Sequence, residues 1–301
     1  LRMTTPTTWA GHTQGGEPLR RCMNRVPLAK PFWDEECEKA AISALSSGRW
    51  VKGPQARMFG EEFAKWCGAA AAVPCQSGSA ALWAAMRLLD IGPGDEVIVP
   101  GMTFIATATS VSLVGATPIF ADIEEDYWCI CPEDVEAKIT DKTKAIIGVH
   151  IFGQAFSPRL REICDKHGIA LVEDAAQAHG ASLNGTLAGA IGDVACFSFF
   201  PSKNMAVGGE GGMITTTRND LAQKLSRLVD HGRNDDLESI ELGTNLRMSE
   251  VSAAIGRIQL KHIDNWTSQR RKNATDIAHT TQIRPNSEHA WHQLCVLSDD
   301  P

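Results

Sequence analysis

The chain has 301 residues, of which 43% are hydrophobic and 22% charged, so it can bury a sizeable core, either in one large domain with a smaller one or in two unequal domains. Its net charge of −7 includes no basic block, which argues against a nucleic-acid-binding protein. No apolar run is long enough to span a membrane, and residues 1–25 are polar and rich in glycine, without the apolar centre of a signal peptide.

The predicted elements alternate between helices and strands from about Arg57 onward. Residues 80–89 carry apolar side chains on one helical face, and a Gly-Pro-Gly-Asp turn at 92–95 ends this helix. Apolar runs typical of buried strands recur between segments of helix length, which predicts an α/β fold with a mostly parallel sheet covered on both faces. The predicted strands are 97–99, 118–123, 145–150, 169–173 and 194–199.

One helix between two of these strands has well-defined ends in the sequence. Ser157 is the expected N-cap, Pro158 the first helical residue, and Gly168 follows the last turn. The strand after it ends at Asp174. Because open α/β sheets bind ligands at the carboxyl ends of their parallel strands, this position alone makes Asp174 a candidate site residue.

Cysteine and histidine are scattered along the chain. The nine cysteines include no Cys-x-x-Cys pair, which predicts reduced thiols and a cytoplasmic protein. His289 and His292 lie three residues apart, and we interpret them as structural and predict no metal site.

Gln76-Ser77-Gly78-Ser79 opens the predicted helix at residue 80. Small residues at a helix N-terminus leave backbone N–H groups exposed at the positive end of the helix dipole, where a phosphate binds well. An ordinary serine N-cap would give the same pattern.

Asp174 directly follows Glu173 at the end of an apolar strand. Two adjacent buried acids are costly unless at least one of them has a partner. That partner is either a buried lysine or arginine, or the cationic ring nitrogen of a ligand.

Lys203 follows the apolar run that ends in Phe197-Ser198-Phe199. Partial burial there would lower its pKa and make the neutral amine available for Schiff-base chemistry, although a surface or salt-bridged lysine is the ordinary alternative. The glycine-rich loop 208–212 fits neither the dinucleotide fingerprint nor a Walker A loop, so an NAD or ATP enzyme is not supported. Residues 243–250 predict a loop that leads into an N-capped helix through Leu260.

Taken together and in order, these stretches resemble the DegT/DnrJ/EryC1/StrS family of sugar aminotransferases, which depend on pyridoxal phosphate (PLP). The similarity runs from about Val26 to Trp266 and is weaker at 289–297. It implies a three-layer, aspartate-aminotransferase-like fold with a polar extension at 1–25, a large PLP-binding domain at 26–266 and a stub of a small C-terminal domain at 267–301. Family members continue beyond the point that corresponds to Pro301, so we expect most of that small domain to be missing.

The resemblance also implies roles for individual residues. Lys203 matches the Schiff-base lysine, and Asp174 matches the carboxylate that keeps the pyridine nitrogen protonated. Asn245 matches a residue that reaches the phosphate of the neighbouring subunit, which implies a homodimer with shared sites. The remaining cofactor contacts implied are Phe104 on the ring face, Gln177 near the ring hydroxyl, and Gly78, Ser79 and Ser198 at the phosphate.

The activity expected from the resemblance is transfer of an amino group from an amino acid, glutamate or glutamine by family analogy, to a keto-sugar nucleotide or similar cyclic ketone. One alternative is a sugar dehydratase of the same family, which Lys203 argues against because that branch has histidine there. The other is a truncated homologue without catalytic activity, which the missing C-terminal part favours and the intact set of site residues opposes.

Overall fold

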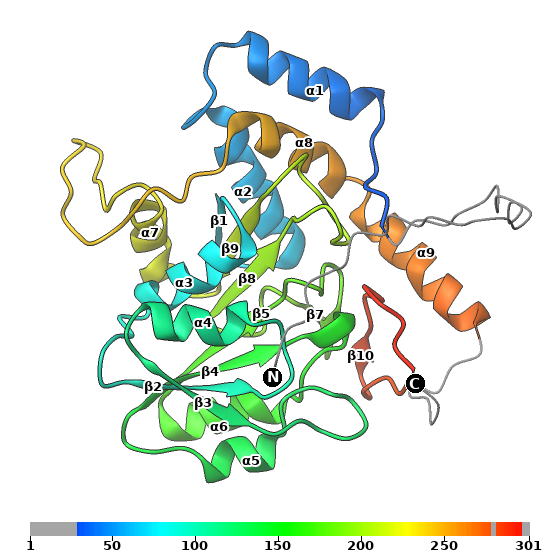
Figure 1. Ribbon diagram of the computed structural model, residues 1–301. Coiled ribbons are helices and arrows are strands. Elements are labelled where there is room, and N and C mark those ends of the chain that lie inside the picture. Colours follow the sequence, from blue (N-terminus) through cyan, green and yellow to red (C-terminus); the bar gives the residue numbers. More distant parts are fainter. Residues whose placement is uncertain (1–28, 278–280, 297–301) are drawn as a thin grey trace, which may run out of the picture. The chain divides into compact units, whose positions relative to one another are not determined.

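The computed structural model describes residues 29–277 and 281–296, and its centre is a seven-stranded sheet (Figure 1). By its internal contacts the chain divides into residues 1–30 and 31–301, and the sheet belongs to the second unit. The strand order is β1-β9-β8-β5-β4-β2-β3, in which β9 runs antiparallel to both of its neighbours and the other pairs are parallel. The strands are β1 (Ala71–Cys75), β2 (Glu96–Pro100), β3 (Thr117–Ala121), β4 (Thr143–Val149), β5 (Ala170–Asp174), β8 (Val194–Ser198) and β9 (Gly212–Thr216).

Helices cover both faces of this sheet, which confirms the predicted three-layer α/β fold. Alternate strand residues point to opposite faces, so Val97 packs with α3, α4 and α7 whereas its neighbour Ile98 packs with α5 and α6. Further along the second face, Phe197 of β8 packs with α2, α8 and α9. The helices are α1 (Glu35–Ser46), α2 (Pro54–Cys67), α3 (Gly78–Leu88), α4 (Ala106–Leu113), α5 (Pro132–Ala137), α6 (Arg159–His167), α7 (Asn219–Leu228), α8 (Glu250–Leu260) and α9 (Ile263–Asp276), with a 3-10 turn at Ile151–Gly153.

A small second sheet brings the C-terminal part of the described chain next to the large one (Figure 1). Its strands are β6 (Ser182–Leu183), β7 (Thr186–Leu187) and β10 (Ser287–Glu288) in the order β10-β6-β7. Residue 266, the predicted end of the large domain, lies inside the unbroken helix α9. The predicted division at 266 stays a prediction, and the extension predicted at 1–25 lies outside the described residues.

The predicted strands all form, with shifts of a few residues at their ends. The sequence did not predict β1 or β9, and β9 is antiparallel because residues 199–211 contain no crossover helix that could return the chain in parallel. Helix α6 begins at Arg159, one residue later than predicted, since Ser157 accepts the N–H of Leu160 through its backbone oxygen (3.1 Å) in a tight first turn. Its end at Gly168, in the left-handed region (φ 65°), is as predicted. No helix in the described ranges combines the length and the apolar character that a membrane crossing requires.

Candidate active site

Seven predicted site residues line one cavity of about 470 Å³. It opens at the carboxyl ends of β4, β5 and β8, the edge of the sheet where we expected a ligand to bind. Because β5 and β8 are neighbours in the sheet, Asp174 and the turn after Ser198 come together although they are far apart in the chain. These residues are Gly78, Ser79, Phe104, Asp174, Gln177, Ser198 and Lys203.

Asp174 is a buried carboxyl group whose two oxygens each have one hydrogen-bond donor. Thr107 donates its hydroxyl to Oδ2 (2.8 Å), and Ala176 donates its backbone N–H to Oδ1 (3.2 Å). Burial raises the pKa of Asp174 above its ordinary value, and the hydrogen bond from Thr107 opposes this. Asp174 forms no ion pair with any residue that the structure describes, which leaves its acidic face available to a cationic ligand. The sequence did not single out Thr107, because a threonine inside a helix carries no special signal.

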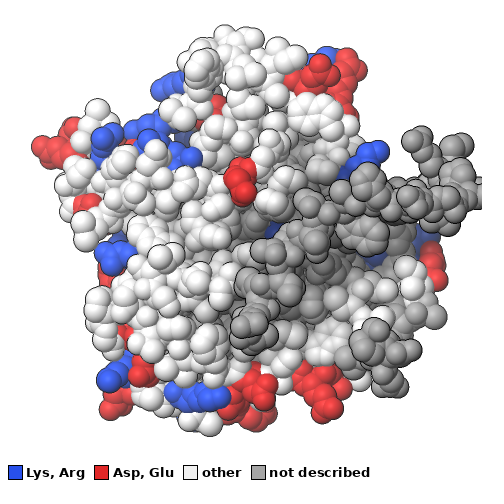
Figure 2. All heavy atoms as spheres, in the orientation of Figure 1, with Lys and Arg blue, Asp and Glu red and all other residues white. Residues whose placement is uncertain are grey.

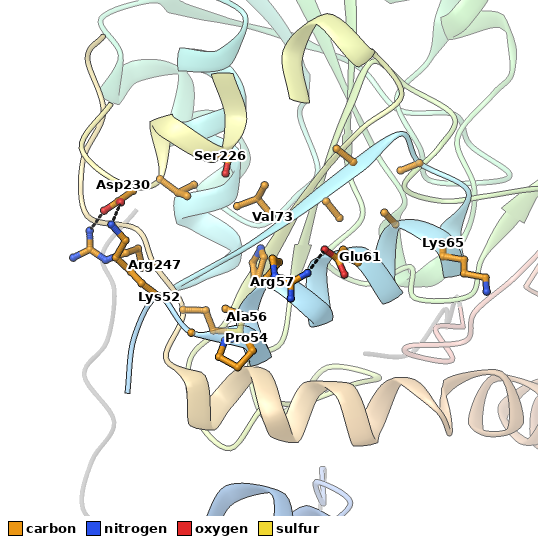
Figure 3. Close-up of a pocket in the computed structure, with 18 of the residues that line it drawn as sticks. Lys52, Pro54, Ala56, Arg57, Glu61, Lys65, Val73, Ser226, Asp230 and Arg247 are labelled. Carbon is orange, nitrogen blue, oxygen red and sulfur yellow. Dashed lines mark hydrogen bonds and ion pairs between the residues drawn. The ribbon is translucent and has the colours of Figure 1, made fainter. Parts of the chain in front are cut away.

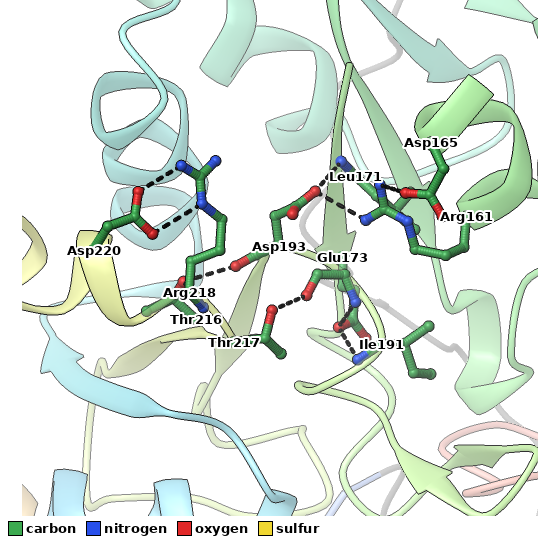
Figure 4. Close-up of polar contacts among 11 residues, drawn as sticks. Arg161, Asp165, Leu171, Glu173, Ile191, Asp193, Thr216, Thr217, Arg218 and Asp220 are labelled. Atoms are coloured by element: carbon green, nitrogen blue, oxygen red, sulfur yellow. Dashed lines mark hydrogen bonds and ion pairs between the residues drawn. The ribbon is translucent and has the colours of Figure 1, made fainter. Parts of the chain in front are cut away.

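Glu173, the other acid of the pair, is hydrogen-bonded to other groups of the chain (Figure 4). It accepts the backbone N–H groups of Gly189 (2.9 Å), Ile191 (2.8 Å) and Gly192 (2.7 Å), and its Oε2 lies 2.9 Å from His150 Nε2. Glu173 therefore fixes the loop before β8, and of the two adjacent acids only Asp174 faces the cavity.

A second carboxylate fixes the opposite end of the same strands (Figure 4). Asp193 accepts the backbone N–H of Leu171 (2.8 Å) and a guanidinium N–H of Arg161 (3.0 Å). Its backbone oxygen accepts the hydroxyl of Thr216 (2.7 Å), so that β5, β8 and β9 are joined at one point. These contacts hold β5 and β8 in the register that sets Asp174 beside Lys203.

Lys203 lies in the turn after β8, where its backbone N–H donates to Phe200 O (2.8 Å). The side chain is half-buried and lines the cavity. Burial lowers the pKa of its amine, while the negative charge of Asp174 raises it to a smaller extent. A lowered pKa increases the fraction of neutral amine, which is the nucleophilic form.

The N-terminus of α3 forms another wall of the cavity. Ser77 is the N-cap and accepts the N–H of Ala80 (3.1 Å), whereas the N–H groups of Gly78 and Ser79 have no acceptor among the described residues. A Cβ on Gly78 would lie 2.7 Å from Ser198 Cβ, so only glycine lets the helix approach this close. Free N–H groups at a helix N-terminus make this wall a good site for an anion.

Phe104 and Gln177 lie at the cavity's other boundaries. The Phe104 ring is 71% exposed, which leaves it free to cover a planar ligand. Gln177 Oε1 accepts the backbone N–H of Phe152 (2.6 Å), so its amide NH₂ group is the part left for a ligand.

Asn245, the remaining predicted site residue, does not line this cavity. It is exposed and forms a β-bridge with Asp230. Asp230 lines a separate groove of about 960 Å³ (Figure 3). Three of the five cations that line the groove form ion pairs: Asp230 binds both Lys52 (2.5 Å) and Arg247, and Glu61 binds Arg57 (2.7 Å).

His179 should make folding stability depend on pH. Its ring is fully buried, neither nitrogen has a partner among the described residues, and burial lowers its pKa from 6.5 to about 3. Below pH 6.5 His179 therefore binds a proton in the unfolded chain but stays neutral in the folded one. The free energy of unfolding decreases for this reason as the pH falls from 6.5 towards 3. The loss is about 1.4 kcal/mol per pH unit, or about 2 kcal/mol at pH 5.

Urea unfolding of wild type and His179→Leu at pH 8 and pH 5 checks this expectation. The variant should lose about 2 kcal/mol less than wild type between the two pH values. Equal losses in both proteins would contradict it.

The DegT/DnrJ/EryC1/StrS aminotransferase family has a sequence model that matches residues 31–300. The chain belongs to this family. A dTDP-3-amino-3,4,6-trideoxy-α-D-glucose transaminase of Streptomyces venezuelae is 40% identical over 290 residues, which are 91% of this chain and 76% of that protein. The L-glutamine:2-deoxy-scyllo-inosose aminotransferase of Streptomyces kanamyceticus is 39% identical over 267 residues, 81% of this chain and 62% of that protein.

Solved structures of DegT/DnrJ/EryC1/StrS proteins share this fold. The S. venezuelae protein DesV is 41% identical and superposes with a TM-score of 0.83 over 85% of this chain and 72% of its own. Spr1654 of Streptococcus pneumoniae, known in PMP and PLP forms, is 28% identical with a TM-score of 0.82 over 89% and 76% of the two chains. The family uses PLP as its cofactor.

The cavity fits PLP on the chemistry of its walls. It offers an amine of lowered pKa at Lys203, a buried carboxyl group at Asp174 and N–H groups at Gly78 and Ser79, and within residues 29–277 and 281–296 neither the carboxyl group has an ion pair nor the N–H groups an acceptor. These groups complement the aldehyde, the ring nitrogen and the phosphate of PLP. The prediction of a PLP enzyme is therefore confirmed by the family.

Proposed function

We propose that this chain transfers an amino group from an amino acid, glutamate or glutamine, to a keto-sugar nucleotide or a similar cyclic ketone. The observation that carries the proposal is the meeting of Lys203 and Asp174 in one cavity beside the N-terminus of α3. The S. venezuelae relative is named for a nucleotide sugar and the S. kanamyceticus relative for glutamine and a cyclitol ketone. These names support the two substrate classes.

Bound PLP supplies an electron sink conjugated with the carbon atom that exchanges its amino group. Lys203 Nζ acts as the nucleophile that holds the cofactor, and once released it moves a proton to and from the substrate carbon. Its lowered pKa keeps part of the amine neutral, as both tasks require. Asp174 would hold a proton on the ring nitrogen of bound PLP through a charge-assisted hydrogen bond, and Thr107 orients that carboxylate.

The other cavity residues bind and orient the cofactor. Gly78 and Ser79 would donate backbone N–H groups to the phosphate, and the Ser198 hydroxyl would add a third donor. Gln177 would donate its amide NH₂ to the ring hydroxyl, because its oxygen already accepts the backbone N–H of Phe152. Phe104 would cover one face of the ring and keep water from it.

We infer that the protein works as a homodimer in which Asn245 reaches the phosphate bound by the other subunit. Asn245 is exposed and lies outside its own cavity. The surface over α3 and α4 carries few charged side chains (Figure 2), and Phe104, Ile105 and Leu113 are each more than 60% exposed there. A large uncharged surface of this kind is typical of a contact between subunits. We also place the protein in the cytoplasm, since its described cysteines are all free thiols.

The proposal predicts two half-reactions that can be measured separately. PLP-loaded protein mixed with glutamate or glutamine should release the corresponding keto acid in an amount equal to the enzyme. A thymidine-diphosphate keto-hexose or a cyclitol ketone added next should be aminated, as mass spectrometry of the product would show. Release of keto acid without amination of either ketone class would contradict the proposed acceptor. If no keto acid is released, the proposed aminotransferase activity is wrong.

A further inference from the structure

Asn204, the residue after Lys203, is only 5% exposed although its side chain is polar. Its Nδ2 donates to Ala290 O (3.2 Å), and its Oδ1 lies 3.0 Å from His292 Nδ1. A buried amide is stable only where its donors and acceptor are paired, so both contacts matter to its placement. Both partners come from residues 287–293, which we call the C-terminal strap.

The C-terminal strap is anchored from several sides. Its first residues form β10, which pairs with β6. Arg271 donates to His289 O (3.1 Å), and Arg270 donates to Trp291 O (3.1 Å), so α9 fixes the middle of the strap. Ala290 and Trp291 are buried. These contacts fix the strap against β6 and α9.

The strap also contacts Phe152 in the turn after β4, next to His150 and Ile151, which line the cavity. His292 donates its backbone N–H to Phe152 O (2.9 Å), and Phe152 donates its own N–H to Gln177 Oε1 (2.6 Å). Gly153, at φ 99°, permits the close approach, because a Cβ there would lie 3.0 Å from Trp291 N. One segment thus links the residue beside Lys203 with Gln177, which lines the same cavity.

We propose that Asn204 and His292 are positioning residues that fix the turn carrying Lys203 and so aim its Nζ into the cavity. This inference rests on the proposed function, because it takes Lys203 as the reacting amine. The hydrogen bonds of Asn204 restrain the backbone of the turn from which the Lys203 side chain extends. Because that side chain is long, even a small rotation of an unrestrained turn would displace Nζ by a larger distance. His292 can donate Nδ1–H to Asn204 as a neutral ring, since burial and the charges of Lys203 and Arg270 lower its pKa to about 4.

The test compares capture of PLP by the Lys203 amine in wild type, Asn204→Leu, His292→Leu and His292→Asn. Capture joins Nζ to the aldehyde carbon of PLP and releases the aldehyde oxygen as water; absorbance follows its rate, and borohydride reduction fixes the label for peptide mapping. Asparagine can place an amide N–H where His292 has Nδ1, so His292→Asn tests rescue. Thr215→Val is the matched stability control, because it removes one buried hydrogen bond, to Gly189 O (2.7 Å), in β9.

The two leucine variants should capture PLP at least about tenfold more slowly than wild type and lower kcat more than they change KM for the donor. His292→Asn should recover to within about threefold of wild type, and Thr215→Val should match wild type while melting at a similarly reduced temperature. The inference is wrong if the leucine variants capture PLP at the wild-type rate, if Thr215→Val is equally slow, or if asparagine fails to rescue. Absence of label on Lys203 in wild type would instead overturn the proposed function on which the inference rests.

Discussion

Replacing Lys203 with alanine should lower transamination by about ten-thousandfold or more, since the same amine serves as nucleophile and proton carrier. Lys203 has no ion pair among the described residues, so its removal costs the fold little. The variant should unfold near the wild-type temperature. Steady-state turnover with glutamate and a keto-sugar nucleotide measures the loss.

Two further variants sharpen this prediction. Lys203→Arg keeps a positive charge but cannot release a proton near neutral pH, so it should be as inactive as the alanine variant. Lys224→Ala removes a different half-buried lysine, which pairs with Asp90 (2.7 Å) on the surface, and should leave turnover unchanged. Substantial turnover by Lys203→Arg would show that charge and not proton transfer is what position 203 supplies.

Replacing Asp174 with asparagine should lower transamination by about a hundred- to a thousandfold while PLP stays bound. An amide cannot hold the ring nitrogen protonated, because it lacks the negative charge that stabilises the cation. Single-turnover rates with glutamate measure the effect on the first half-reaction, and absorbance measures cofactor occupancy. Near-normal rates in this variant would overturn the role of Asp174.

Stability separates this chemical effect from damage to the fold. Burial raises the pKa of Asp174, so the folded apo protein resists ionisation of this group and loses stability as pH rises above the ordinary value of 3.8. Asparagine removes that cost, and we expect the apo variant to melt no lower than wild type at pH 7. Thr107→Val should give a smaller loss of rate, because the carboxylate remains but loses its orienting hydrogen bond. A variant that melts early would point to a structural cause.

The sequence predicted the site because its chemistry lies in local patterns. Asp174 and Lys203 each follow an apolar strand, and parallel strands bring their carboxyl ends to one edge of the sheet, so their meeting follows from topology. The anion site at the N-terminus of α3 could also be predicted, because its residues Ser77, Gly78 and Ser79 are consecutive in the sequence.

The parts that were missed depend on contacts between distant residues. Thr107 reaches Asp174 across 67 positions, and Asn204 reaches His292 across 88, and no spacing in the sequence signals either contact. His292 was interpreted only as structural, whereas it lies beside the residue that follows Lys203. Asn245 is a different case, because its predicted role needs a second subunit and stays a prediction.

Lys203 should bind PLP in the cavity that Asp174 lines. The most direct measurement is to add PLP to wild type and Lys203→Ala, reduce both with borohydride, digest them and locate the label by mass spectrometry. Our account predicts a reduced cofactor on residue 203 of wild type and no label in the variant. Label on another lysine in both proteins, or no label in either, would contradict it.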